Sequence, residues 1–479
     1  MEYEAVIGLE THVQLKTRSK MWCGCANQFG APPNTHVCPV CLGLPGVLPV
    51  VNDEALRLTA LTGLMLNSKI SAHAKFDRKN YFYPDSAKNY QITQYDRPST
   101  EGGWFEFEYD GAGSLDGLAR VKITRAHLEE DVGKNVHFDR FSGVDFNRAG
   151  VPLLEIVSEP DLTSSAMAYE YLTSLTAALV REGVSDCDME KGMVRCDVNV
   201  SVRPKGSQKL GAKVEIKNMN TFSGVRRALD YEIPRQMAVV AAGGAIPQET
   251  RRWDELAGIT ETMRSKEDAH DYRYFPEPDL MPFVPVDEWM NSVRSRLVEM
   301  PLALKKRLIR EYGIPAGDAE VLTNDWPLAD YFERAVRGAK NSKGVANWVI
   351  NNLRARLVQR GCGLEDMRFP ISGIGELVEL VDSGRVSSKI AQEVFEQMFE
   401  RGESPAAIVE HKGLSQVSDV GAIEEFCREV IVGNPKSAED FRAGKPAALN
   451  FLKGQVMKLS KGKANPGMAG AVLERLLRG

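Results

Sequence analysis

The sequence predicts an α+β protein in three parts: a mixed domain over residues 1–292 and two helical domains over 293–405 and 406–479. Up to about residue 290, strand-like and helical stretches follow one another at irregular spacing, without the regular alternation of a doubly wound fold. After residue 293 the chain reads as helix after helix. These two observations, with an alternating strand near the N-terminus, set the fold class.

The N-terminal strand is predicted over residues 6–15, VIGLETHVQL. Read with a period of two, one face is mostly apolar and the other carries Glu10, His12 and Gln14. The side chains of Glu10 and His12 point the same way and could hold a metal or a charged ligand over a sheet. On this stretch alone, a half-exposed strand with a solvated polar face is the favoured interpretation.

Length and composition are those of an ordinary globular protein. The chain has 479 residues, enough for roughly three domains, and 43% of them are hydrophobic. Its net charge of −5 gives no overall nucleic-acid signature, so any RNA contact would come from a local basic patch. No apolar run is long enough to predict a membrane span, and Met1 is followed almost directly by the first strand. We therefore expect a cytoplasmic protein without a signal or transit segment.

Four of the eight cysteines crowd into two close pairs, Cys23 with Cys25 and Cys38 with Cys41. Two pairs of thiolates on two tight turns suit tetrahedral Zn²⁺, and in a reducing compartment they indicate metal rather than disulfides. His36 could replace one sulfur, and four free buried thiols are the alternative. Because four protein ligands leave no open position, the predicted zinc site is structural rather than catalytic.

The next elements are a helix over residues 53–66, with Asn52 as its N-cap, and a strand-like run over 75–85. The run at 75–85 mixes cations with aromatic rings. Such a stretch can hold phosphate or stack a base, and it can equally be a packed edge strand. Short strands are predicted after it at 104–109 and 119–128.

Glu155 interrupts an apolar run over residues 151–157 that is typical of a buried strand. An unpaired buried carboxylate is costly, so Glu155 needs a cation, a metal or a raised pKa. Arg148 could be a purely structural partner, and metal ligation is an equally weighted alternative at this point.

Alternating helices and strands complete the mixed part of the chain. Helices are predicted at 166–182 and after Asn220, and strands at 194–202 and 213–217. An aromatic loop that contains prolines, DYRYFPEPD, follows at 271–279.

Several common catalytic motifs are absent from the sequence. It has no G-x-x-x-x-G-K-[ST] loop, which excludes an ATP site of the P-loop kind, and no G-x-G-x-x-G between a strand and a helix. No amidase-type serine loop and no cysteine nucleophile paired with a histidine stands out. If the chain belongs to an amide-forming system, we expect it not to liberate the ammonia itself.

Six blocks of sequence are long and unusual enough to identify a family. They are IGLETHV at 7–13, FDRKNYFYPD at 76–85, DFNRAGVPLLEI at 145–156, RCDVN at 195–199, DYRYFPEPD at 271–279 and KGKANP at 461–466. In these blocks the chain resembles, over its whole length, the B subunit of the bacterial tRNA-dependent amidotransferase, aspartyl/glutamyl-tRNA(Asn/Gln) amidotransferase.

The resemblance implies an N-terminal cradle domain with an antiparallel, glutamine synthetase-like sheet, then a helical domain and a tail that engages tRNA. It implies a ligase that forms carbon–nitrogen bonds with glutamine as amide donor. ATP would phosphorylate the side-chain carboxylate of Asp on tRNA(Asn) or Glu on tRNA(Gln), and ammonia from the partner amidase, the A subunit, would displace the phosphate. A small C subunit would complete a heterotrimer. The alternative is a non-catalytic, zinc-containing scaffold that binds tRNA.

By the same resemblance the Mg²⁺ ligands are His12, Glu130 and Glu155, with Glu10 beside them as a further catalytic residue. Magnesium between carboxylates and ATP oxygens would supply the charge neutralisation that phosphoryl transfer needs. His12 fits poorly with Mg²⁺, so it could bind a softer ion such as Mn²⁺ or donate to a phosphate oxygen. Lys79 is a candidate phosphate contact by its charge. The four cysteines match the members of the family that contain zinc.

Positive charge is concentrated at the end of the chain. Residues 441–479 carry eight lysines and arginines against one acid, Glu474. A solvated helical face is the usual interpretation of a charge run, but an excess of one sign favours contact with the RNA backbone. The predicted tRNA-binding residues are Lys453, Lys458, Lys461 and Lys463.

Overall fold

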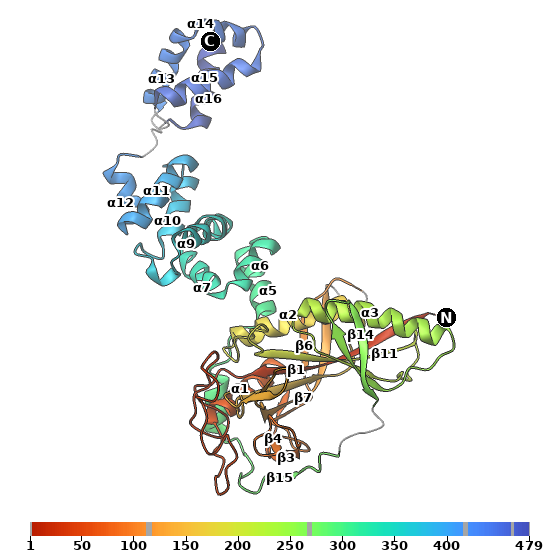
Figure 1. Cartoon of the computed structure of the whole chain (residues 1–479). Helices are drawn as coiled ribbons and strands as arrows, with labels where there is room; N and C mark the ends of the chain where they lie inside the picture. Colours follow the sequence, from red (N-terminus) through yellow and green to blue (C-terminus); the bar gives the residue numbers. More distant parts are fainter. Residues whose placement is uncertain (1, 112–116, 266–270, 415–419, 461–463, 479) are drawn as a thin grey trace. The chain divides into compact units, whose positions relative to one another are not determined.

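The computed structural model describes residues 2–111, 117–265, 271–414, 420–460 and 464–478. The chain divides into two compact units, Met1–Leu302 and Ala303–Gly479. The first unit contains the strands and the first helices, and the described part of the second is helical (Figure 1). The predicted α+β class with a helical C-terminal part is therefore confirmed.

A large sheet of ten described strands forms the centre of the first unit. Its middle strand is β1 (Tyr3–Gln14), which pairs antiparallel with β11 (Val194–Pro204) on one side and β10 (Pro152–Ser158) on the other. Strand β7 (Leu118–Glu130) then pairs antiparallel with β10. Near its end, β1 alternates buried residues with partly exposed ones, so one face of the sheet is left open there.

The remaining strands extend the sheet at both edges. Beyond β11 lie β12 (Val214–Lys217), β13 (Glu249–Asp254) and β14 (Ile259–Ser265). Beyond β7 lie β5 (Thr100–Glu101) and β2 (Lys69–Ile70), and β6 (Trp104–Glu108) also pairs with β7. The pairs within this sheet are antiparallel, as predicted, except for β12 with β13, which is parallel.

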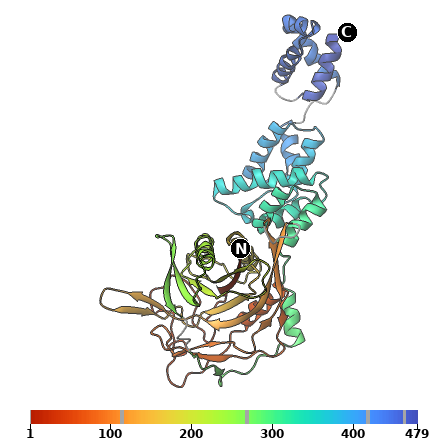
Figure 2. The ribbon, with the colours of Figure 1, turned by 90° about the vertical axis from the view of Figure 1, so that its right-hand side faces the viewer.

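Two long helices, α2 (Ser165–Arg181) and α3 (Phe222–Ala241), pack side by side over one face of this sheet (Figures 1 and 2). Each begins at a hydroxyl residue, Ser164 or Thr221, whose side chain accepts a backbone N–H of the first turn. The apolar stripes of both helices are buried in the main core. These helices therefore close one face of the sheet.

Helix α1 (Asp53–Met65) begins where the sequence predicts it. The side-chain oxygen of Asn52 accepts the backbone N–H of Glu54 at 3.0 Å and of Ala55 at 3.3 Å. This cap satisfies two of the donors that a helix N-terminus leaves without a partner.

Two small sheets complete the first unit. Strand β3 (Asp77–Asn80) pairs with β4 (Tyr90–Thr93) and β15 (Phe275–Pro276), on the side of the large sheet away from α2 and α3 (Figure 1). Strands β8 (Lys134–His137) and β9 (Ser142–Asp145) form a separate two-stranded hairpin. The strand-like run predicted at 75–85 is thus a short strand of four residues followed by a loop.

The first unit ends with α4 (Asp287–Arg294). Next in the chain come α5 (Pro301–Tyr312), α6 (Ala316–Asn324), α7 (Trp326–Ala335), α8 (Ser342–Asn347), a π-helical segment (Trp348–Leu353) and α9 (Arg354–Arg360). After a short 3₁₀ turn (Leu364–Asp366) come α10 (Gly373–Asp382), α11 (Ser388–Arg401), α12 (Pro405–His411), α13 (Val420–Gly433), α14 (Pro435–Arg442), α15 (Pro446–Leu459) and α16 (Pro466–Arg478). In the described part of the chain, no helix is both long and apolar enough to cross a bilayer.

The second unit contains two separate groups of buried apolar residues. One extends from Leu304 to Val409 along the chain, and the other from Ile423 to Leu477. Ile408 and Val409 on α12 belong to the first group, so the core crosses the predicted boundary at 405/406. The division into three domains at 292/293 and 405/406 stays a prediction.

Candidate functional site

The open face of the sheet brings together side chains from three neighbouring strands. His12 on β1 lies directly opposite Glu155 on β10, and Glu155 lies opposite His127 on β7. Directly opposed residues of an antiparallel pair point to the same side of the sheet. Glu129 follows His127 by two residues on β7 and therefore shares its face.

Short distances connect these four side chains. Nε2 of His12 lies 3.3 Å from Oε2 of Glu155 and 3.9 Å from Oε1 of Glu129. Nε2 of His127 lies 3.5 Å from the same oxygen of Glu155. One ligand atom each from His12, Glu129 and Glu155 lies within 4.8 Å of the others, an arrangement that could hold a metal ion.

Burial and charge set the protonation preferences of this cluster. Burial by itself would raise the pKa of Glu155, but the hydrogen bond from His12 and the charges of His127 and Lys79 hold it well below its usual range. Burial opposes the charged form of His12, but the negative charges of Glu155 and Glu129 outweigh burial and raise the pKa of His12. Burial lowers the pKa of His127 to about 4, and burial with the charge of Glu155 raises the pKa of Glu129. Glu155 is therefore the carboxylate of this cluster that is held most firmly in its charged form.

Arg148 is not the partner of Glu155. Its Nε donates to the carbonyl of Val132 at 3.0 Å and lies 3.6 Å from Oδ2 of Asp131. The ion pair with Arg148 that could have explained Glu155 structurally is therefore not formed. Two histidines, His12 and His127, face the carboxylate instead.

The structure does not bring Glu130 to His12 and Glu155. Its carboxylate accepts Nζ of Lys88 at 2.5 and 2.6 Å and the backbone N–H of Ile92 at 2.9 Å. Neighbouring residues of a strand point to opposite faces, so Glu129 and Glu130 serve different partners. Sequence reasoning missed Glu129, although strand parity with His127 would have found it.

Glu10 lies on the same face of β1 as His12, as its position in the strand predicts. Its Oε1 accepts Nδ2 of Asn199 at 2.7 Å. Glu10 is therefore next to the cluster along the strand, and the three groups that lie close enough for one metal ion do not include it.

A cavity of about 470 Å³ opens over the cluster and carries both signs of charge. His12 and Glu129 line it together with three cations, Lys79, Arg195 and Lys217. Arg195 Nη2 lies 2.9 Å from Oδ1 of Asp131, and Lys217 pairs with Asp197. Sequence reasoning did not select Arg195 or Lys217 as site residues, although Arg195 opens one of the six blocks used for the resemblance.

Lys79 is the predicted phosphate contact, and the structure places it in this cavity. Its Nζ lies 5.0 Å above the ring of Tyr272. Burial opposes its charge, but Glu129, Tyr274 and other neighbours outweigh burial and raise the pKa of Lys79. Lys79 therefore presents a positive charge beside the carboxylates.

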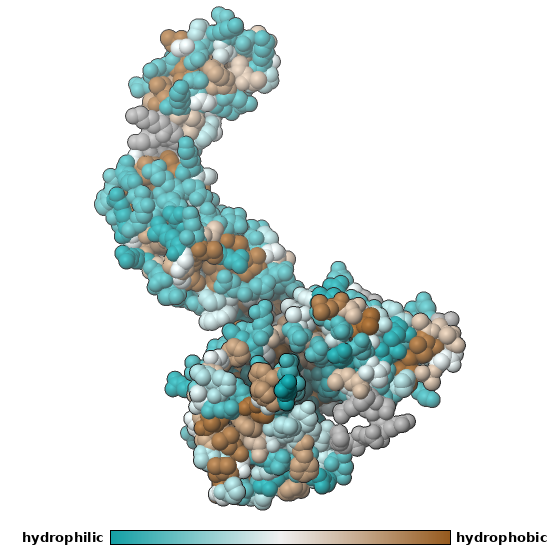
Figure 3. Space-filling model, viewed as in Figure 1, coloured by the Kyte–Doolittle hydropathy of each residue, from teal (hydrophilic) through white to brown (hydrophobic). Residues whose placement is uncertain are grey.

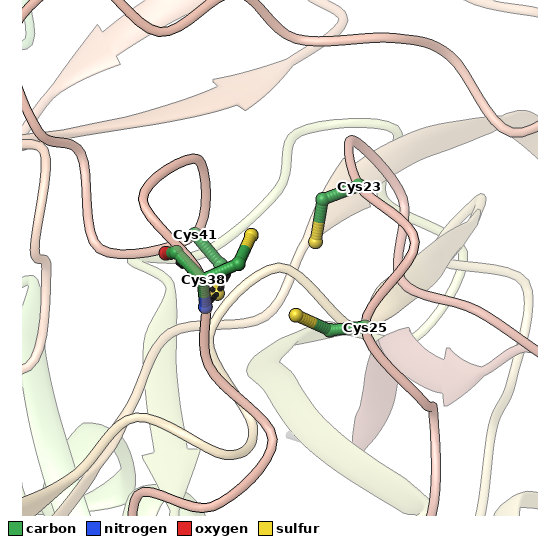
Figure 4. Close-up of side chains that lie close together, drawn as sticks. All are labelled: Cys23, Cys25, Cys38 and Cys41. Carbon is green, nitrogen blue, oxygen red and sulfur yellow. Dashed lines mark hydrogen bonds between the residues drawn. The ribbon is translucent and has the colours of Figure 1, made fainter.

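The four clustered cysteines converge as the sequence predicts (Figure 4). Their sulfurs lie within 4.8 Å of one another, and the Sγ atoms of Cys38 and Cys41 are 3.9 Å apart. A hydrogen bond from Cys23 is the main influence that lowers the pKa of the Cys41 thiol to about 4. Four converging sulfurs fit a tetrahedral structural zinc. The group that could hold a metal does not include His36.

Two of the four predicted tail lysines can be placed. Lys453 lies on α15 with the end of its side chain over Gly470 of α16, and Lys458 is exposed near the end of α15. Lys461 and Lys463 lie outside the described residues.

Comparison with known proteins covers nearly the whole chain. Residues 5–291 match the model of the GatB/GatE catalytic domain, and residues 330–477 match that of the GatB domain. The chain is 52% identical over 470 residues, 97% of each sequence, to the B subunit of the aspartyl/glutamyl-tRNA(Asn/Gln) amidotransferase of Carboxydothermus hydrogenoformans. It is 49% identical to the protein of that name from a Thermoanaerobacter species, over all of both chains, and 51% identical to the one from Methylacidiphilum infernorum, over 100% of this chain and 99% of that protein.

Proposed function

The chain belongs to the family of aspartyl/glutamyl-tRNA(Asn/Gln) amidotransferase B subunits, and from this premise we propose how it acts. It transfers the γ-phosphoryl group of ATP to the side-chain carboxylate of Asp on tRNA(Asn) or Glu on tRNA(Gln). ADP leaves, and ammonia then displaces inorganic phosphate from the acyl phosphate to give the amide. The ammonia comes from glutamine in a partner A subunit, and a small C subunit completes the complex in the cytoplasm.

The observation that carries this proposal is the group of His12, Glu129 and Glu155 beside a cavity that contains three cations. Phosphoryl transfer depends on alignment and charge neutralisation more than on a protein nucleophile. A divalent cation held by the two carboxylates and His12 would neutralise ATP oxygens when bound. Since Mg²⁺ prefers oxygen ligands, the imidazole makes Mn²⁺ a second suitable ion.

The cations of the cavity then have a direct role. Lys79, Arg195 and Lys217 face the space beside the carboxylates, where they hold phosphate oxygens and keep the reacting groups aligned. Glu129 takes the place predicted for Glu130 among the metal ligands, because only Glu129 shares the face of His12 and Glu155. Glu10 accepts a hydrogen bond from Asn199 and lies beside His12 on the same face of β1.

Glu155 supplies the decisive experiment. Glu155→Ala in the assembled complex should abolish tRNA-dependent ATP hydrolysis and transamidation, while hydrolysis of glutamine by the partner persists. Glu101→Ala, at an exposed carboxylate on β5 of the same sheet, is the matched control and should change neither activity. Near-normal transamidation by the Glu155 variant would refute the assignment of Glu155 to the metal, and absence of tRNA-dependent ATP hydrolysis by the wild-type complex would favour the non-catalytic scaffold.

The second half of the proposal concerns the structural zinc site and the binding of tRNA. Cys23, Cys25, Cys38 and Cys41 hold a structural zinc that fixes the loop between β1 and α1. Lys453, Lys458, Lys461 and Lys463 contact the tRNA backbone through the basic tail. Assays with both mischarged tRNAs decide whether Asp-tRNA(Asn), Glu-tRNA(Gln) or both are substrates.

A further inference from the structure

Hydrophobic residues reach the surface of the first unit in several places (Figure 3). One group differs from the others because its members are all aromatic and two of them line the cavity. We call it the aromatic panel, and its members are Tyr81, Phe82, Tyr83, Tyr95, Tyr272 and Tyr274. Tyr81 and Tyr272 line the cavity itself, and Phe82 and Tyr95 are 68% and 52% exposed.

Backbone hydrogen bonds hold the two halves of the panel together. The N–H of Asn80, at the end of β3, donates to the carbonyl of Tyr272 at 3.0 Å. Its side chain donates to the same carbonyl at 3.1 Å and to that of Arg273 at 2.9 Å. The rings that follow β3 are thereby fixed beside the rings of residues 272–274, although almost 200 residues separate them in sequence.

The turn between Tyr272 and Tyr274 is strained. Arg273 has φ of +44°, a left-handed conformation that is unfavourable for a residue with a long side chain. Oδ1 of Asp271 accepts the N–H of Arg273 at 3.0 Å and, with Asn80, maintains this turn. Strain of this kind persists where the surrounding structure fixes a local shape, and here that shape holds Tyr272 in the lining of the cavity and Tyr274 against Tyr95.

The rings are stacked and accompanied by cations. The centroids of Tyr95 and Tyr274 are 4.2 Å apart with an interplanar angle of 7°, and those of Tyr81 and Tyr83 are 5.6 Å apart at 24°. The guanidinium of Arg273 lies 5.6 Å from the ring centroid of Phe82. Aromatic rings with cations beside them are the usual platform for unpaired nucleobases and the phosphates attached to them.

We propose that the aromatic panel stacks an unpaired nucleobase of the substrate and thereby holds the attached phosphate or ester over the cavity. This inference rests on the proposed function. It predicts one of two sources for the base: the adenine of ATP or the unpaired 3′ end of the aminoacyl-tRNA. Aromatic and arginine side chains are also enriched in protein interfaces, so loss of a partner subunit is one of the outcomes of the test.

The test removes ring faces without changing charge. The double variant Tyr272→Leu/Tyr274→Leu is compared with Tyr272→Phe/Tyr274→Phe in the full complex. Phe141→Leu is the matched control, because Phe141 is 66% exposed and stacks on Phe138 in a turn outside the panel. The leucine variant should weaken the binding of one of the two substrates about tenfold to a hundredfold. The phenylalanine variant and the control should bind both substrates within about twofold of the wild type.

Two readouts separate the sources. A rise in the dissociation constant of ATP, measured by equilibrium dialysis, assigns the panel to the adenine of ATP. A rise in KM for aminoacyl-tRNA, with loss of quenching of a 2-aminopurine at the 3′ end of the tRNA, assigns it to that end.

Unchanged values of both in the leucine variant, with transamidation intact, would overturn the proposal. Loss of the partner subunits on gel filtration would also overturn it, in favour of a protein interface. Failure of the proposed function is a separate result, namely a wild-type complex without tRNA-dependent ATP hydrolysis. Binding of ATP and of a 3′-end oligonucleotide still tests the panel in that case.

Discussion

Adjacent carboxylates on β7 have opposite environments. Glu129 faces His12 and the cavity, whereas Glu130 accepts Lys88 and a backbone N–H on the other side of the strand. The resemblance assigned Glu130 to the metal, and only the alternation of side chains along the strand separates the two residues. The sequence marks His12 and Glu155 as candidates, because His12 shares a polar strand face with Glu10 and Glu155 interrupts an apolar run, but these local signals alone leave a solvated face and a structural ion pair open.

The two glutamates give a matched pair of variants. Glu129→Gln should weaken binding of Mn²⁺ by the complex at least tenfold and reduce ATP-dependent transamidation, because a charged ligand is lost. Glu130→Gln should leave Mn²⁺ affinity nearly unchanged but lower stability by about 3 kcal/mol, because Lys88 loses its buried counter-charge. Titration of Mn²⁺ by electron paramagnetic resonance and thermal unfolding measure the two effects. The opposite pattern would restore Glu130 as the ligand.

At the scale of elements, capped helices and alternating strands were predictable from the sequence. Helix α1 begins at the predicted residue because Asn52 is an unambiguous N-cap, and it ends one residue before the predicted end. The sequence does not decide between a strand and a binding segment at 75–85, because its cations and rings belong both to the short strand β3 and to the loop that follows it. Strands β8, β9 and β15 are short and contain no fully buried residue, so no buried periodicity marks them.

The cysteine loop provides a prediction about metal content. Purified protein should contain about one zinc per chain, and Cys38→Ser should lose it, because the four sulfurs form one tetrahedral site. Cys362→Ser, outside the cluster, is the control. Elemental analysis measures the metal, and chelation should lower the thermal midpoint of the wild type and of Cys362→Ser but not that of Cys38→Ser. Metal-free protein with four freely titratable thiols in the native state would reject the site.

The end of helix α2 contains a carboxyl group that should respond to pH. Burial raises the pKa of Glu182 to about 7, although its oxygens accept the N–H of Val298 at 3.2 and 3.3 Å. The unfolded chain releases this proton near pH 4.5, and the folded chain retains it to about pH 7. Ionisation of Glu182 therefore destabilises the fold progressively across this window, and the full cost remains at higher pH.

Glu182→Gln removes this cost because the amide does not ionise and still offers an acceptor to Val298. The variant should match the wild type near pH 4.5 and exceed it in stability by about 1–3 kcal/mol above pH 7. Thermal unfolding across a pH series measures the difference. A stability difference that is constant with pH would show that Glu182 ionises normally in the folded protein.

At the scale of the whole molecule, the site depends on pairings between distant segments. β1 meets β10 and β11, which lie far along the chain, and the register of these pairs sets His12 opposite Glu155. Sequence periodicity identifies the strands but carries no register between them. The family resemblance supplied the fold in advance, whereas the partners of each charged group, such as Arg148 with Asp131, became visible only in the structure.

The basic tail gives the last prediction, and the buried core shows where the chain should be truncated to remove this tail alone. Ile408 and Val409 belong to the core that begins at Leu304, so a deletion from 406 would damage that core as well as remove the tail. A chain that ends before Val420 loses only the buried group from Ile423 to Leu477. This truncation should raise the KM for aminoacyl-tRNA and leave hydrolysis of glutamine by the complex unchanged.

Charge reversal tests the same surface without deletion. Lys458→Glu, at an exposed position on α15, should weaken tRNA binding and reduce the dependence of log Kd on log salt by about one unit for each phosphate that is no longer neutralised. Lys343→Glu, exposed at the start of α8, is the matched control and should bind tRNA normally. Filter binding across a salt titration measures both. Equal affinity and slope for the wild type and the truncated complex would mean that α13–α16 do not bind RNA, and that the positive charge of residues 441–479 serves a solvated surface.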